Sequence, residues 1–170
     1  MSKHWTYTET YVKGLYDQLA ISSPEQLNIH KISQQLNIHL IYWDEESQAV
    51  KYDNVYFIFL TNGLNKEEEY ETFMHELGHL LLHIGRQDNM PKAFRDYQEY
   101  KAKQFMLHAT VPTFMLEKVI ENSTYSPILT IQKAFNVSLS VAKQRYEHYY
   151  NRERLNNINK QKYIMQNSVS

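Results

Sequence analysis

The chain has 170 residues, of which 42% are hydrophobic and 22% charged, a composition that supports a folded core and excludes global disorder. Eighteen Lys and Arg residues nearly balance nineteen Asp and Glu residues, which argues against a general nucleic-acid binder. The absence of cysteine excludes disulfide scaffolds, Cys-rich zinc modules and cysteine nucleophiles. The first residues lack the apolar region of a signal peptide, and the longest apolar run, Val55–Leu60, is too short to span a membrane. We therefore expect a cytoplasmic protein that makes no membrane contact.

Two helices and three strands are predicted in the first third of the chain. Apolar residues at helical spacing indicate a helix over about residues 5–20, and Ser23-Pro24 is typical of the start of a second helix over about 25–36. Runs of β-branched and aromatic residues then predict strands at His39–Trp43, Gln48–Tyr52 and Val55–Leu60. Asp53-Asn54 fits a two-residue hairpin turn. We expect a small three-stranded antiparallel sheet.

The remainder of the chain is predicted to be helical. Asn65, followed three residues later by Glu68, is the signature of a capped helix, and Gly85 is expected to end it. A second helix is expected over about residues 92–109, ending near Val111-Pro112, and two or three shorter helices follow to about residue 150. The fold class is therefore α+β, with one domain over residues 1–150, C-terminal helices at about 112–150, and a flexible tail at 151–170.

The chemistry is indicated by His75-Glu76-Leu77-Gly78-His79, an HExxH motif. Residues four apart on a helix lie on the same face, so the two imidazoles point at one spot and can bind a single Zn²⁺. Glu76 projects beside that spot, where it can accept a proton from the attacking water. Gly78 leaves room for another element to approach the helix closely.

A catalytic zinc needs a third protein ligand and an open position. Glu99 lies in the next predicted helix, where small Ala102 shares its face and permits close approach to the first helix. Asp96, one turn earlier, and His108, late in the same helix, are alternatives. His83 continues the series at i+4 after His79, but its apolar neighbours favour a histidine that packs in the core or supports a ligand.

These motifs resemble the ImmA/IrrE family of metallo-endopeptidases, which are gluzincins encoded by phages and mobile elements. The resemblance covers roughly residues 25–150 and depends on HELGH at 75–79, on Glu99-Tyr100-Lys101-Ala102 with Phe105, and on Val111-Pro112. It departs from the family at Met106 and at Ala109-Thr110-Val111, where the family has Ala and Leu-Leu-Met. It implies a zincin-like domain with one Zn²⁺ held by His75, His79 and Glu99, and Glu76 as the catalytic residue.

The resemblance also implies a protein substrate, a helix-turn-helix transcriptional repressor whose cleavage relieves repression of the element. An alternative is a zinc-bearing anti-repressor that inactivates its partner by binding. A DNA-binding regulator is a third interpretation, because the segment Ala134–Ser138 resembles the turn of a helix-turn-helix. The balanced charge instead favours two packed helices there, so no direct nucleic-acid contact is expected.

Two features of the active site stay open at this level. Tyr97, Tyr100 and His108 are unranked candidates for a further donor to the oxyanion. An extended substrate could add to the edge of the predicted strand Val55–Leu60, or that strand could simply belong to the core.

Overall fold

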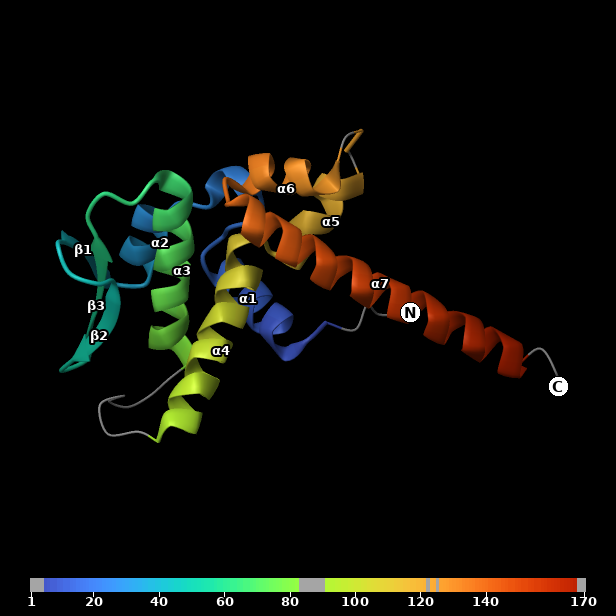
Figure 1. Cartoon of the computed structure of the whole chain (residues 1–170), viewed down its shortest axis with the longest axis horizontal. Helices are drawn as coiled ribbons and strands as arrows, with labels where there is room; N and C mark the ends of the chain where they lie inside the picture. Colours follow the sequence, from blue (N-terminus) through green and yellow to red (C-terminus); the bar gives the residue numbers. More distant parts are fainter. Residues whose placement is uncertain (1–4, 83–90, 122, 125, 168–170) are drawn as a thin grey trace.

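The computed structural model describes residues 5–82, 91–121, 123–124 and 126–167 (Figure 1). It contains a three-stranded sheet and helices in an α+β arrangement, as predicted. The elements are α1 (Tyr7–Gln18), a 3₁₀ turn η1 (Pro24–Gln26), α2 (Ile29–Gln35), β1 (Ile38–Trp43), β2 (Gln48–Tyr52), β3 (Val55–Thr61), α3 (Lys66–Leu82), α4 (Lys92–Thr110), α5 (Thr113–Glu121), α6 (Pro127–Phe135) and α7 (Leu139–Asn167). None of the helices in these described ranges is long and apolar enough to cross a lipid bilayer.

The sheet is mixed, so the prediction of a purely antiparallel sheet is wrong. Its strand order is β1-β3-β2, with β1 parallel and β2 antiparallel to β3. The chain passes from one edge of the sheet to the other between β1 and β2, and β3 then enters the centre. β3 carries Ile58 and Leu60, which are both fully buried, and a central position buries such an apolar strand best.

The predicted hairpin turn between β2 and β3 is confirmed. Tyr52 and Val55 face each other, and the two residues between them, Asp53 and Asn54, have φ values of 44° and 64°. Two successive positive φ values are those of a type I′ turn, whose twist matches that of the flanking strands. Because β1 and β2 occupy both edges of β3, an added substrate strand on β3 is excluded.

The predicted second helix is interrupted. Instead of one helix over residues 25–36, the chain forms η1 and then α2, with Asn28 in extended conformation between them. The Asn28 side-chain oxygen accepts a hydrogen bond from the Lys31 N–H at 3.0 Å. An asparagine that caps a new helix in this way competes with continuation of the preceding one.

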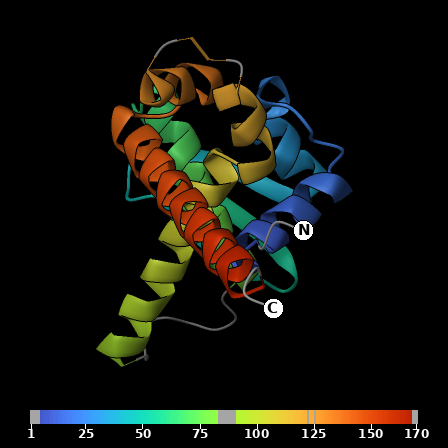
Figure 2. The ribbon, with the colours of Figure 1, turned by 90° about the vertical axis from the view of Figure 1, so that its right-hand side faces the viewer.

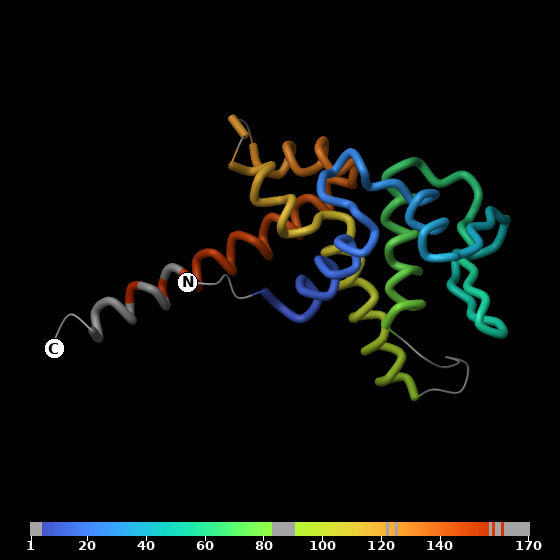
Figure 3. Tube along the Cα trace, turned by 180° about the vertical axis from the view of Figure 1, so that it is seen from behind, coloured from blue at the N-terminus to red at the C-terminus, as the bar shows by residue number. Residues whose placement is uncertain are grey.

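α7 is longer than predicted, since it continues as one helix through the residues expected to form a flexible tail from Asn151. Arg152 pairs with Glu9 of α1 and with Glu117 of α5, the latter at 3.2 Å, and so fixes the middle of α7. Beyond this point α7 extends away from the other helices, as Figures 1 and 3 show. The α6–α7 turn places Phe135 and Val137 in the core, as expected for two packed helices.

α3 lies between the sheet and α4 (Figures 1 and 2). Phe73 and Leu77 of α3 and Phe105 of α4 are fully buried in the core. Gly78 meets α4 so closely that a Cβ there would lie 3.0 Å from Phe105 Cδ1 and 3.2 Å from Ala102 Cα. The expected roles of Gly78 and Ala102 in close helix packing are thereby confirmed.

Two glycines in the described helices, Gly14 and Gly78, predict stability changes of opposite sign. We expect Gly78→Ala to lower the free energy of unfolding by about 1–3 kcal/mol, because the added methyl overpacks the α3–α4 contact. A Cβ added at Gly14 of α1 would meet no atom within 4 Å. Because alanine favours a helix more than glycine does, Gly14→Ala should raise the free energy of unfolding by about 0.5–1 kcal/mol. Urea denaturation measures both, and a neutral or stabilising Gly78→Ala would contradict the tight packing.

Candidate active site

The helix that carries the HExxH motif begins with a capping box. Asn65 Oδ1 accepts hydrogen bonds from the N–H groups of Glu67 and Glu68, each at 3.0 Å, and Glu68 Oε2 accepts from the Asn65 N–H at 3.0 Å. The start predicted from the sequence is confirmed. The predicted end at Gly85, like His83, lies outside the described residues.

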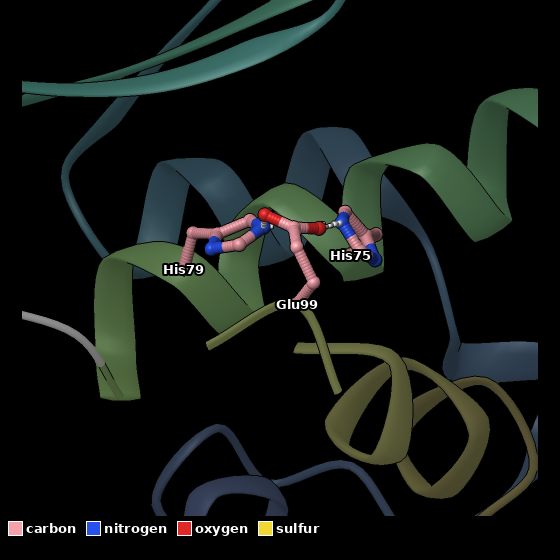
Figure 4. Close-up of side chains that lie close together, drawn as sticks. All are labelled: His75, His79 and Glu99. Carbon is pink, nitrogen blue, oxygen red and sulfur yellow. Dashed lines mark hydrogen bonds and ion pairs between the residues drawn. The ribbon is translucent and has the colours of Figure 1, made fainter. Parts of the chain in front are cut away.

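Three side chains from two helices converge beside the sheet (Figure 4). His75 and His79 come from α3, and their Nε2 atoms lie 3.1 Å apart. Glu99 comes from α4, and its two carboxylate oxygens each lie 3.3 Å from one of these nitrogens. The structure thus brings together the three residues that were put forward from the sequence as metal ligands.

The donor set fits a small divalent cation. Each of the three residues offers one ligand atom, a ring nitrogen or a carboxylate oxygen, and these atoms all lie within 4.8 Å of one another. Ligand atoms at about 2.0–2.1 Å from a tetrahedral zinc are about 3.3 Å apart, close to the observed separations of 3.1 and 3.3 Å. Two nitrogens and one carboxylate are the ligands of a catalytic zinc site that keeps a fourth position open.

Glu76 is buried next to this triad. Burial raises the pKa of its carboxyl to about 7, the negative charge of Glu99 adds to the rise, and a hydrogen bond from the Ala49 backbone opposes it. The carboxylate therefore lies close enough to Glu99 to feel its charge and is held by a main-chain group of β2. The HExxH motif does not predict the contact between Ala49 and Glu76, because any residue except proline supplies the same backbone N–H.

The hydrogen bond to Glu76 also shows which edge of β2 faces the site. Ala49 lies opposite Ile58 of β3, but its N–H points to Glu76 on α3. Along a strand, the backbone groups of every second residue point to the same side, so the N–H and C=O of Lys51 point outward too. This outer edge of β2 has no strand partner among the described residues.

The other candidates lie elsewhere. Asp96 is exposed and pairs with Lys92 at 2.7 Å. His108 is buried near the far end of α4, with its ring 6.3 Å from that of His148, and burial together with the charge of Arg145 lowers its pKa to about 3. It is too far along α4 to join Glu99 as a ligand or to act as an oxyanion donor. Tyr97 faces away from Glu99, and Tyr100 is exposed.

The convergence predicts metal binding that depends on Glu99. Elemental analysis of protein purified without added metal should find about one zinc per chain, and Glu99→Ala should lose it or bind it far more weakly. Asp96→Asn and His108→Gln serve as controls on the same helix and should keep the metal. If Glu99→Ala keeps the zinc and one control variant loses it, the residue changed in that control is the third ligand.

One family model and two relatives match this chain. The model of the Peptidase_M78 family, described as the IrrE N-terminal-like domain, matches residues 33–147. The phage-like element PBSX protein XkdA of Bacillus subtilis (strain 168) is 38% identical over 154 residues, which cover 90% of this chain and 78% of that protein. The uncharacterized protein YqaB of the same strain is 32% identical over 148 residues, 85% of each chain. The matched residues include α3 and α4, and the chain belongs to the IrrE N-terminal-like peptidase family.

Proposed function

We propose that this protein is a zinc-dependent endopeptidase that cleaves a helix-turn-helix transcriptional repressor in the cytoplasm and so relieves repression of a phage or mobile element. The observation that carries the proposal is the convergence of His75, His79 and Glu99 beside the buried carboxylate of Glu76. Membership of a peptidase family supports the reaction, and the name of the relative XkdA, a protein of a phage-like element, supports the setting.

In this proposal one zinc is held by the Nε2 atoms of His75 and His79 and by the carboxylate of Glu99. Zinc, when bound, supplies Lewis acidity toward water and toward a carbonyl oxygen. Zinc is inferred from the family resemblance, and a donor set of two imidazole nitrogens and one carboxylate oxygen is compatible with zinc.

Glu76 is the proposed general base. Its carboxylate takes a proton from the attacking water as the water oxygen bonds to the carbonyl carbon, and it gives that proton to the nitrogen of the leaving amine as the peptide C–N bond breaks. The Ala49 N–H holds the carboxylate toward the sheet side of the site. Burial excludes bulk water from Glu76, which favours proton transfer to and from the reacting groups.

The outer edge of β2 is the proposed binding place for the substrate backbone. The Lys51 N–H and the carbonyl groups of Ala49 and Lys51 point outward along this edge, so an extended segment can add there as a further strand. Such binding requires an unfolded or flexible stretch of substrate, as in a linker between two domains.

Replacement of the base separates the endopeptidase from the binding-only anti-repressor. We expect Glu76→Gln to keep about one zinc per chain and to reduce peptide cleavage by at least about 10²-fold. Cleavage is measured by mass-spectrometric detection of new termini in a synthetic peptide library. Glu67→Gln, on the first turn of the same helix, is the matched control and should cleave normally. Full activity in Glu76→Gln would exclude the proposed base.

A proline at position 51 tests the substrate edge. Lys51→Pro removes an outward N–H without removing a hydrogen bond to β3, so the fold should persist. We expect cleavage to fall by about tenfold or more, because the substrate loses a backbone partner. Lys51→Ala keeps the N–H and removes only the side chain, and it should cleave normally. Equal rates for the proline and alanine variants would show that this edge does not bind substrate.

A further inference from the structure

A pocket of about 210 Å³ lies on the opposite side of α4 from the metal-binding triad. Tyr97, Lys101 and Phe105 of α4 are spaced four residues apart and share the face that lines it. Glu99 is two residues away from both Tyr97 and Lys101, which is about 200° around the helix. Residues of the first turns of α1 and Leu82 of α3 complete the lining, which includes none of the triad residues. Its principal lining residues are Tyr7, Tyr11, Leu82, Tyr97, Lys101 and Phe105.

The pocket has a buried aromatic floor and an exposed aromatic rim. Phe105 is fully buried at its base and meets the Tyr11 ring edge-on, with the ring centres 6.2 Å apart. Tyr7 and Tyr97 are 76% and 53% exposed. Aromatic side chains left exposed around a hollow are typical of surfaces that bind a partner's side chain.

Lys101 is the only charged residue among the described residues that line the pocket. Its Nζ lies 5.5 Å from the centre of the Tyr97 ring, and no carboxylate in the described ranges forms an ion pair with it. A lysine that lines an aromatic pocket, with no ion-pair partner among the described residues, favours a ligand that carries negative charge next to an apolar group.

The size of the pocket restricts what it can hold. Sites for small molecules and cofactors usually measure about 300–1,000 Å³, so this one is better suited to a single large side chain. An aromatic ring fills such a space and stacks on the surrounding rings. The neighbouring residues of the same peptide then lie at the rim, within reach of Lys101.

We propose that this pocket docks an aromatic side chain flanked by acidic residues, presented by the protein substrate at a place away from the scissile bond. The identity of the partner as substrate rests on the proposed endopeptidase function. Docking on one side of α4 and cleavage on the other requires a substrate long enough to reach both, which restricts cleavage to proteins that carry both segments.

Titration with short peptides tests the pocket directly. The probe is acetyl-Glu-Phe-Glu-amide, followed by nitrogen–proton NMR of the whole zinc-loaded chain, with acetyl-Glu-Ala-Glu-amide and acetyl-Lys-Phe-Lys-amide as controls. We expect shifts at the residues that line the pocket, and binding by both control peptides at least about tenfold weaker. Equal binding of the lysine-flanked peptide, or shifts confined to other surfaces, overturns the proposal.

Variants separate docking from catalysis. Lys101→Gln should weaken the acidic peptide about fivefold or more, whereas Lys103→Gln, an exposed lysine two residues away, should bind it normally. Glu99→Ala should also bind it normally, because the triad lies on the other side of α4. If cleavage is absent in the wild type but this titration succeeds, the proposed function fails and the docking site stands. Concentration-dependent shifts at the pocket without peptide would identify a second copy as the occupant and overturn the proposal.

Discussion

The metal-binding triad depends on the close contact between α3 and α4 at Gly78. The backbone of α4 approaches so near that a Cβ at position 78 would lie 3.2 Å from Ala102 Cα. At this close approach of the two helices, the carboxylate of Glu99 lies 3.3 Å from both His75 Nε2 and His79 Nε2. The same helix uses its opposite face to form the aromatic pocket, so the position of α4 determines both the proposed metal site and the proposed docking site.

The parts of the structure that depend on short-range spacing could be predicted from the sequence. The four-residue spacing of His75 and His79 places both imidazoles on one face of a helix, and the structure shows their Nε2 atoms 3.1 Å apart. Asn65 and Glu68 predicted the start of that helix because a capping box needs only local hydrogen bonds. Helical periodicity made Glu99 a candidate for the third ligand, with Asp96 and His108 as alternatives, and the structure brings Glu99 to the two histidines.

The parts that depend on contacts between distant segments could not be predicted. The strand order β1-β3-β2 arises because β3 is buried between two partners, and a pattern of apolar residues does not say which strands pair. The hydrogen bond from Ala49 to Glu76 uses a main-chain N–H, which leaves no mark in the sequence. The helical continuation of α7 beyond residue 150 is accompanied by pairing of Arg152 with Glu9, more than 140 residues earlier. The direction of α7 and the position of the pocket share this dependence on tertiary packing.

Assembly of a metal site by the α3–α4 contact is tested most directly by a crystal structure of the zinc-loaded protein, with anomalous diffraction recorded at the zinc absorption edge. We predict one peak at about 2.0–2.1 Å from His75 Nε2, from His79 Nε2 and from an oxygen of Glu99. A zinc bound by the two histidines without Glu99, or a zinc away from α3, would contradict the proposal that this contact assembles the site.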